Sequence, residues 1–174
     1  MVRGKLPLRV GHRAVLGTSS SRKVAVMAEL LTDNRPSWCQ YFDGIAEATL
    51  ERADCIRRKV GAVFTYKNRI ISTGYNGTKE PGLPGCLTGA CPRGHLSYDE
   101  QPAFEGYGNC IANHAETNGL DWILEHCPDI PLDQVVVHVG CQPCPHCQER
   151  LDFHKIAVCY PGMPPGPCPI ERAG

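Results

Sequence analysis

Two short motifs with one predicted strand between them constrain the fold of this chain more than any other feature. His114-Ala115-Glu116 begins one helical pattern, and Pro143-Cys144-Pro145-His146-Cys147 begins the next. A Cys-x-x-Cys pair at a helix N-terminus can direct two thiolates at one metal ion, because the helix dipole favours the ionised thiols. Right-handed crossover connections place the starts of consecutive helices at the same edge of a sheet. The fold is therefore expected to bring His114 to Cys144 and Cys147.

Two thiolates and one imidazole leave the fourth position of a tetrahedral zinc ion open, which is typical of a catalytic site. We predict a catalytic zinc whose ligands are His114, Cys144 and Cys147. Glu116 lies two residues from His114, so it can reach water at the open position without binding the metal, and we predict that it is the general acid and base. A redox pair or a structural zinc site would also account for the two thiols, but neither accounts for the upstream His-x-Glu.

Hydrophobic periodicity predicts alternating helices and strands around these motifs. Ser37 and Gln40 form a capping box, and the apolar residues after them recur at the spacing of an amphipathic helix. Two β-rich runs on either side of Lys67-Asn68 predict a hairpin. The expected elements are helices over residues 37–53, 114–127 and 144–154, and strands over 60–66, 69–75, 134–139 and 156–160. This order predicts an α/β domain layered around a sheet.

The chain is expected to consist of a basic, disordered leader over residues 1–34, a catalytic domain over 35–161 and a Pro-rich tail over 162–174. Residues 1–26 carry six basic side chains and no acidic one. The apolar stretch of the leader is shorter than the roughly seven residues of a secretory signal core, whereas its Arg and Ser content also fits a transit peptide. An extension upstream of a start at Met27 is a further alternative.

Charge and composition limit the partners of the chain. It has 18 basic and 18 acidic residues, so the part after residue 26 carries 12 basic against 18 acidic side chains. Polymer binding needs a broad positive face, so we expect a small-molecule nucleotide substrate and no nucleic-acid polymer. The longest apolar runs are far shorter than the roughly 20 residues that cross a bilayer, so we expect no membrane partner. Without a secretory signal, the 11 cysteines are expected to be reduced in the cytoplasm.

Three further segments carry a family resemblance when they are read with the two motifs. They are Arg58-Lys59-Val60-Gly61-Ala62-Val63, Ile71-Ser72-Thr73-Gly74-Tyr75-Asn76-Gly77 and Cys110-Ile111-Ala112-Asn113-His114-Ala115-Glu116. Together with Pro-Cys-x-x-Cys they resemble the zinc-dependent cytidine and deoxycytidylate deaminase family, and within it the deoxycytidylate (dCMP) deaminases. The resemblance covers roughly residues 36 to 160. It implies a cytidine-deaminase-like three-layer α/β/α fold with a central mixed sheet, and hydrolysis of dCMP to dUMP and ammonia.

The resemblance also implies roles for single residues. Asn76 would hydrogen-bond the sugar or the base edge, although Asn is also common in a Gly-flanked turn for backbone reasons. The backbone N–H of Ala115 would hold the pyrimidine carbonyl. Zinc would lower the pKa of its water from about 15.7 towards about 7, so that hydroxide attacks C4 of the ring while Glu116 moves the protons. Members of the family are commonly oligomeric, so we expect a homo-oligomer.

Two other functions are kept open. One is deamination of another small nucleoside, nucleobase or secondary-metabolite heterocycle, because Thr117-Asn118-Gly119 and Cys141-Gln142 depart from the usual pattern of the family. Gly119 is also expected to cost its helix up to about 1 kcal/mol against Ala. The other is a non-catalytic, zinc-stabilised binding domain. Glu116 argues against it, because a structural site has no use for an acid beside an open metal position.

A dense basic cluster offers contacts for a 5′-phosphate, or is a solvated helix end that the helix dipole favours. Its members are Arg52, Arg57, Arg58 and Lys59.

A second, structural zinc site is a further hypothesis for the long Gly- and Pro-rich loop over residues 76–109. Four thiolates would brace a loop that is otherwise too long to stay ordered, and some deoxycytidylate deaminases are similar in carrying a second zinc. Its ligands would be Cys55, Cys86, Cys91 and Cys110, with His95 as a substitute fourth ligand. Cysteines without partner spacing are Cys39, Cys127, Cys141, Cys159 and Cys168. His138 is expected to be an ordinary core or surface histidine.

Overall fold

The computed structural model describes residues 35–78, 82–103, 105, 109–163 and 168–169. The predicted leader, residues 1–34, lies outside the described residues, and so does most of the predicted tail. The described residues from Pro36 onward belong to one compact unit. Among the described residues, no helix has the length and apolar character needed to cross a membrane.

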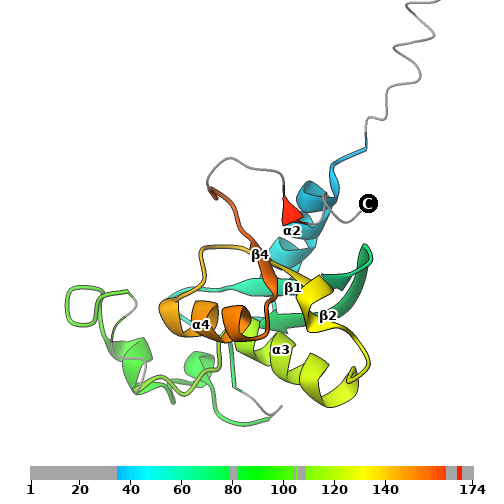
Figure 1. Cartoon of the computed structure of the whole chain (residues 1–174). Helices are drawn as coiled ribbons and strands as arrows, with labels where there is room; N and C mark the ends of the chain where they lie inside the picture. The colour runs from blue at the N-terminus through cyan, green and yellow to red at the C-terminus, as the bar shows by residue number, and fades with distance from the viewer. Residues whose placement is uncertain (1–34, 79–81, 104, 106–108, 164–167, 170–174) are drawn as a thin grey trace, which may run out of the picture. The chain divides into compact units, whose positions relative to one another are not determined.

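Within the described ranges, a four-stranded mixed sheet carries helices on both faces (Figure 1). The elements in chain order are α2 (Trp38–Leu50), β1 (Gly61–Tyr66), β2 (Arg69–Tyr75), α3 (Ala115–His126), β3 (Val136–Val139), α4 (Pro145–Phe153) and β4 (Ala157–Cys159). The strand order is β2-β1-β3-β4. β1 pairs antiparallel with β2 and β3, whereas β3 and β4 are parallel. The predicted α/β fold with a mixed sheet is confirmed.

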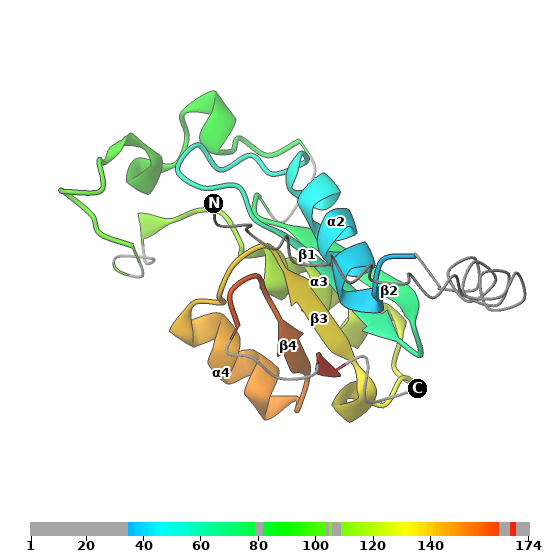
Figure 2. The ribbon, with the colours of Figure 1, turned by 90° about the horizontal axis from the view of Figure 1, so that it is seen from above.

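Side chains alternate between two apolar cores, one on each face of the sheet. Phe64 and Val137 pack with residues of α3 and α4, whereas their neighbours Val63 and Val136 pack with residues of α2. This alternation follows from the two-residue period of a strand. In Figures 1 and 2, α2 lies on one side of the sheet, and α3 and α4 lie on the other. The result is the three-layer α/β/α arrangement.

Local chemistry sets where the first elements begin and end. The Ser37 hydroxyl accepts the Gln40 N–H, and the Gln40 side chain accepts the Ser37 N–H, so the capping box at the start of α2 is confirmed. α2 ends at Leu50, one turn earlier than predicted. Lys67 and Asn68 form the two-residue turn of the β1–β2 hairpin with φ angles of 48° and 57°. Positive φ at both residues matches the twist of the paired strands.

Two glycines allow the helices to approach the sheet closely. A Cβ on Gly61 would lie 2.1 Å from the Ala46 carbonyl oxygen of α2, and a Cβ on Gly74 would lie 2.0 Å from the Ala115 carbonyl oxygen of α3. Both neighbours are backbone atoms, which cannot rotate out of the way. Gly74 therefore sets the distance between β2 and the start of α3, where the predicted site residues lie.

Gly119 has a packing role that its helix propensity does not reveal. A Cβ at this position of α3 would lie 2.4 Å from the Phe64 ring of β1. The Ser72 hydroxyl of β2 donates a hydrogen bond of 2.9 Å to the Gly119 carbonyl oxygen. The close contact between α3 and the sheet thus offsets the expected helix penalty.

The long connection between β2 and α3 is closed at its base, and its described residues include the short 3₁₀ helices Cys86–Thr88 and Pro92–His95. Gly77 N–H donates to the Asn113 carbonyl oxygen at 3.1 Å, and Asn113 N–H donates to the Gly77 carbonyl oxygen at 2.9 Å. This antiparallel bridge fixes both ends of the connection beside the start of α3.

The expectation that all cysteines are reduced is wrong for one pair. Cys39 of α2 and Cys168 form a disulfide. Sequence spacing could not indicate the pair, because the two residues are 129 positions apart. They meet because Cys168 packs with Cys39 on the α2 face of the sheet.

Candidate active site

The structure brings the three predicted metal ligands together at the starts of two helices. His114 is the N-cap residue of α3, Cys144 is the N-cap residue of α4, and Cys147 lies in the first turn of α4. Nδ1 of His114 lies 3.2 Å from Sγ of Cys147 and 3.3 Å from Sγ of Cys144. All three donor atoms lie within 4.8 Å of one another. The two helices therefore start at the same edge of the sheet, as their crossover connections predicted.

Hydrogen bonds within this group change the acidity of its members. The pKa of Cys144 is lowered to about 4, first by a hydrogen bond from the Cys147 thiol and then by one from His114. The backbone N–H of Cys147 also points to Sγ of Cys144, at 3.5 Å. The same hydrogen bond between the two thiol groups, together with burial, raises the pKa of Cys147. Its hydrogen bond to Cys144 raises the pKa of His114. Cys144 is thus the more acidic of the two thiols, and a metal ion bound to both sulfurs would displace the proton of Cys147.

This donor set fits a zinc ion. Zinc takes nitrogen and sulfur ligands at about 2.0 to 2.3 Å in a tetrahedral arrangement, which places two such ligands about 3.5 Å apart. The contacts of His114 with the two sulfurs, 3.2 and 3.3 Å, are close to that spacing. Three protein ligands would leave the fourth position for water.

Glu116 lies in the first turn of α3 and is buried, with 5% of its surface exposed. Burial raises the pKa of this carboxyl, while its own backbone N–H and the charge on His114 act in the opposite direction. Glu116 therefore binds a proton more readily than an ordinary surface glutamate. This property suits a group that must both accept and release a proton near neutral pH.

A cavity of about 120 Å³ adjoins the donor group. His114, Ala115, Glu116 and Cys144 line it. Ala115 is the first residue of α3, and the first N–H groups of a helix have no acceptor within the helix. The family resemblance implies that the Ala115 backbone N–H holds the pyrimidine carbonyl, and Ala115 lines the cavity.

Asn76 also lines the cavity, but its side chain braces the wall. Its Oδ1 accepts the Val60 N–H at 2.8 Å, and its Nδ2 donates to the Arg58 carbonyl oxygen at 2.7 Å. A carboxamide has two N–H groups and two lone pairs on its oxygen. One hydrogen and one lone pair of Asn76 are used in these two bonds, so a second partner can be accommodated.

Two residues of the predicted basic cluster, Arg57 and Arg58, line the cavity. The Arg57 guanidinium donates to the carbonyl oxygens of Leu96, Ser97 and Gln101 and lies 4.3 Å above the Tyr98 ring. Arg57 therefore stabilises the loop over residues 96–101 by hydrogen bonds to its backbone. Arg58 is exposed at the cavity.

Arg93 lines the cavity as well, and sequence reasoning missed it. Its side chain is buried, and it donates to the carbonyl oxygens of Glu105 and Pro102, each at 3.3 Å. A single arginine in a loop without periodicity gives no sequence signal of such a position.

The loop cysteines form a separate cluster. Cys86 and Cys91 are buried, and Cys55 and Cys110 pack against them. Burial would raise the pKa of Cys91, but hydrogen bonds from the Ile111 N–H, the Cys86 thiol and the Gly94 N–H lower it overall. Burial raises the pKa of Cys86 and of Cys110. Among the described residues, the sets whose donor atoms all lie within 4.8 Å do not include these four thiols. Nε2 of His95 contacts the Gly89 carbonyl oxygen at 2.7 Å.

Comparisons with known proteins agree with this geometry. A family model described as the cytidine and deoxycytidylate deaminase zinc-binding region matches residues 36–163. The chain is 39% identical over 133 residues to a deoxycytidylate deaminase of Mycobacterium phage D29, a match that covers 74% of this chain and 97% of the phage protein. It is 34% identical over 126 residues to a deoxycytidylate deaminase of Schizosaccharomyces pombe, covering 71% of this chain but 37% of the yeast protein.

A solved structure shares the fold. It is the dCMP deaminase from the cyanophage S-TIM5 in complex with dCMP and dUMP, with a TM-score of 0.54 and 24% sequence identity. The match covers 72% of this chain and 82% of the cyanophage chain.

Proposed function

The chain belongs to the family of cytidine and deoxycytidylate deaminases, and we propose that it hydrolyses dCMP to dUMP and ammonia. The observation that carries this proposal is the convergence of His114, Cys144 and Cys147 beside the buried carboxyl of Glu116. The substrate assignment is supported by the phage relative, which is named a deoxycytidylate deaminase and is matched over 97% of its length.

In the proposed mechanism, the ligands of one catalytic zinc ion are His114, Cys144 and Cys147. A zinc ion held there would supply a Lewis acid that activates water at neutral pH. Glu116 would accept one proton from the attacking water and pass it to N3 of the pyrimidine. It would then take the proton of the new C4 hydroxyl and deliver it to the amine, which leaves C4 as ammonia. The raised pKa of Glu116 supports both transfers, because the carboxyl must hold a proton between them.

The substrate contacts are assigned to the cavity wall. The Ala115 backbone N–H would hold the pyrimidine carbonyl, and Asn76 would offer its remaining hydrogen and lone pair to the sugar or the base. The positive charges of Arg58 and Arg93 at the cavity favour a nucleotide over a nucleoside, since guanidinium groups pair well with phosphate. Arg58 is the proposed phosphate contact, because it is exposed at the cavity.

A second, structural zinc is proposed at Cys55, Cys86, Cys91 and Cys110. Its support is the burial of Cys86 and Cys91 and the N–H groups of Ile111 and Gly94, which stabilise a thiolate at Cys91. Such a site would tie the 3₁₀ helices of the loop to the segment before α3. The donor atoms would have to move closer together to share one ion.

Three further expectations stay predictions. Residues 35–161 are proposed as the catalytic domain, with residues 1–34 outside it. Assembly into a homo-oligomer and location in the cytoplasm rest on the family resemblance and on the sequence of the leader.

Ammonia release from a panel of pyrimidines tests the proposed function. The zinc-loaded chain is incubated with dCMP, CMP, deoxycytidine, cytidine and cytosine at equal concentrations. We expect kcat/KM for dCMP to exceed that for deoxycytidine by about tenfold or more, because a charge-assisted phosphate contact is lost in the nucleoside. Preference for a nucleoside or a free base would favour the alternative deaminases. Absence of ammonia from every compound would favour the non-catalytic zinc domain.

A further inference from the structure

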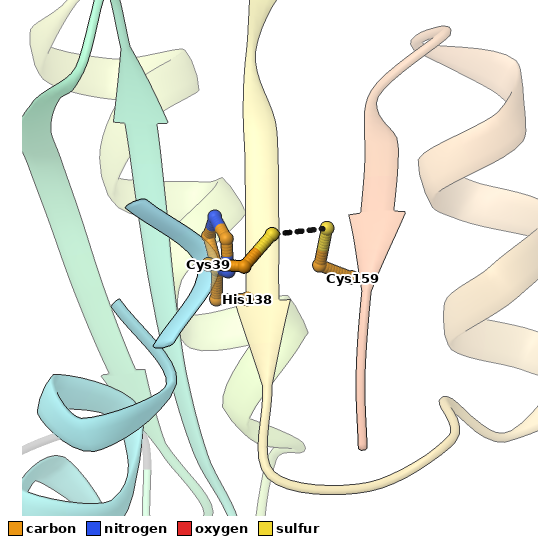
Figure 3. Close-up of side chains that lie close together, drawn as sticks. All are labelled: Cys39, His138 and Cys159. Carbon is orange, nitrogen blue, oxygen red and sulfur yellow. Dashed lines mark hydrogen bonds between the residues drawn. The ribbon is translucent and has the colours of Figure 1, made fainter. Parts of the chain in front are cut away.

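A second group of metal-binding side chains lies on the α2 face of the sheet. Cys39 of α2, His138 of β3 and Cys159 of β4 offer donor atoms that all lie within 4.8 Å of one another (Figure 3). Sγ of Cys39 lies 3.8 Å from Sγ of Cys159. The proposed deamination uses none of these residues, because its ligands lie at the starts of α3 and α4, on the other face.

His138 is the central member of this group, and within the described part of the chain one of its ring nitrogens has no hydrogen-bond partner. The side chain is fully buried. Nδ1 contacts Oδ1 of Asp43 at 3.3 Å, whereas Nε2 is buried and has no hydrogen-bond partner among the residues that the structure describes. Burial lowers the pKa of His138, which favours the neutral ring. A neutral imidazole that donates from Nδ1 to a carboxylate keeps its lone pair on Nε2.

Two generalisations make this arrangement informative. Buried polar atoms in folded proteins nearly always have a partner, so an orphaned nitrogen on a histidine that is grouped with two cysteine sulfurs indicates a ligand. Metal-binding histidines commonly donate their other ring N–H to a carboxylate, which fixes the ring and its tautomer. The carboxylate of Asp43 is placed to accept such a hydrogen bond from Nδ1 of His138.

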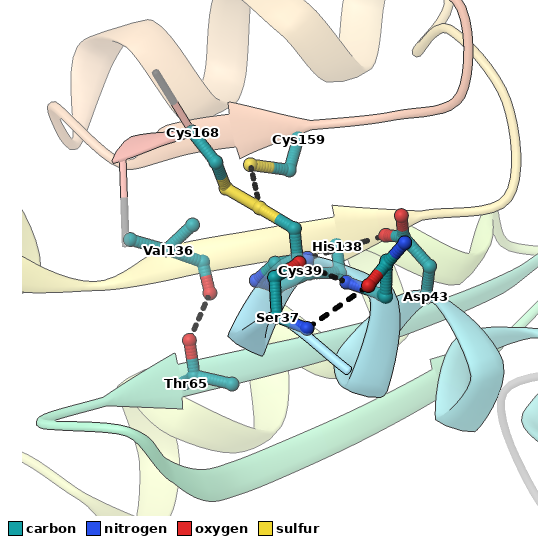
Figure 4. A network of polar contacts seen from close by, with 9 residues as sticks. Ser37, Cys39, Asp43, Thr65, Val136, His138, Cys159 and Cys168 are labelled. Atoms are coloured by element: carbon teal, nitrogen blue, oxygen red, sulfur yellow. Dashed lines mark hydrogen bonds and ion pairs between the residues drawn. A yellow bond between two sulfur atoms is a disulfide. The ribbon is translucent and has the colours of Figure 1, made fainter. Parts of the chain in front are cut away.

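Cys168 adds a third sulfur to the group. It forms the disulfide with Cys39 (Figure 4), so its Sγ is held next to one member of the group, although Cys168 is not in the set whose donor atoms all lie within 4.8 Å of one another. Cys168 also packs in the same apolar cluster as Cys159. Reduction of the disulfide would therefore leave a third thiol next to the group of Cys39, His138 and Cys159.

We propose that, in the reduced protein, Cys39, Cys159, Cys168 and His138 bind a structural zinc ion. A tetrahedral zinc with Zn–S bonds of about 2.3 Å places two thiolate ligands about 3.8 Å apart. The Cys39 and Cys159 sulfurs already have this separation, 3.8 Å. Three thiolates and one imidazole close the coordination sphere, which is the pattern of a structural site.

The two states of the site are linked by a balanced redox step. A thiol reductant supplies two electrons, the Cys39–Cys168 bond breaks, each sulfur gains one proton, and the reductant is oxidised to its own disulfide. Zinc binding then releases the thiol protons of Cys39, Cys159 and Cys168. Oxidation therefore excludes zinc from this site, and zinc binding protects the thiols.

The site would stabilise the edge of the sheet. β4 is an edge strand of three residues that pairs with β3. The disulfide connects residue 168 to α2 only. The zinc site would also connect β3 and β4, through His138 and Cys159, to α2 and to residue 168.

Zinc content of the reduced full chain tests the proposal. Wild type and variants are loaded with zinc in the presence of a phosphine reductant, freed of loose metal and analysed for zinc per chain. We expect Cys159→Ser and Cys168→Ser each to bind one zinc ion fewer than wild type. The matched control is Cys127→Ser, because Cys127 is half-buried in the α3 core and lies outside the described donor groups. It should keep the wild-type content.

Cys168→Ser keeps the test decisive if Cys159→Ser does not fold, since Cys168 lies after the last strand and is only half-buried. Circular dichroism checks the folding of each variant. Equal zinc content in wild type, the Cys127 control and a folded Cys168→Ser variant would overturn the proposal. Loss of one zinc ion from wild type on oxidation, without such a loss in Cys168→Ser, would support it.

Discussion

At the residue scale, the candidate active site depends on how burial and shared hydrogen bonds change the acidity of four side chains. Cys144 is the more acidic thiol of the donor group, and Glu116 binds protons more readily than an exposed carboxyl. The proximity of His114, Cys144 and Cys147, the proposed ligands, could be predicted from sequence because short spacing fixes each of them at a helix start. Arg93 could not be predicted, because its position depends on how the loop folds back over the cavity.

Glu116→Gln should lower kcat for dCMP by about 10²- to 10⁴-fold, which is the usual contribution of a positioned acid and base. Zinc content should stay unchanged, because the three proposed ligands are intact. Steady-state kinetics and metal analysis measure the two quantities. Glu125→Gln, at an exposed position of the same helix, is the matched control and should retain activity. A Glu116→Gln enzyme within tenfold of wild type would contradict the assigned role.

Arg58→Ala should raise KM for dCMP by about 10- to 100-fold, because one charge-assisted hydrogen bond to the phosphate is lost. Deoxycytidine has no phosphate, so its kcat/KM should not change. Arg52→Ala is the control, since Arg52 is exposed and belongs to the same basic cluster but is not among the residues that line the cavity. Equal effects of Arg58→Ala on the nucleotide and the nucleoside would argue against a phosphate contact.

At the scale of single elements, the chain follows its local signals closely, and the differences have physical causes. The capping box of α2 and the turn residues Lys67 and Asn68 form as predicted, because each acts over a few residues. β3 begins at Val136, two residues later than predicted, because Leu132–Gln134 forms a 3₁₀ turn first. The need for Gly119 was missed, since it depends on the Phe64 ring of a distant strand.

Gly74→Ala should lower the free energy of unfolding by about 1 to 3 kcal/mol, because its Cβ would overlap the backbone of α3 and force the helix outward. Gly44→Ala is a control of opposite sign. Gly44 lies in α2, and a Cβ added there would have no neighbouring atom within 4 Å, so alanine should stabilise the protein by up to about 1 kcal/mol. Urea denaturation measures both. Equal stability of Gly74→Ala and wild type would refute the close-packing argument.

At the scale of the whole molecule, contacts between distant segments create features that sequence patterns do not predict. The disulfide between Cys39 and Cys168 and the donor group around His138 join residues more than 90 positions apart. The charge division is visible in the sequence alone: residues 1–26 carry six basic side chains, while the remainder has an excess of acidic ones. This division supports a small substrate for the catalytic domain.

Removal of residues 1–26 should leave kcat/KM for dCMP unchanged, because the proposed catalytic and substrate-binding residues all lie between Asn76 and Cys147 or at Arg58. The assay compares the shortened and the full-length chain at equal zinc content. A large rise in KM on removal would bring the basic leader into phosphate binding.

Zinc-dependent deamination is tested most sharply by the conversion of dCMP to dUMP as a function of zinc in the full chain. The protein is stripped of metal with a chelator, titrated with zinc and followed by the absorbance change of the pyrimidine. We predict that the stripped protein is inactive and that activity returns as the site of His114, Cys144 and Cys147 fills, while Cys147→Ser does not recover. Equal turnover of dCMP by the stripped and the zinc-loaded protein, or none by either, would contradict a zinc-dependent dCMP deaminase.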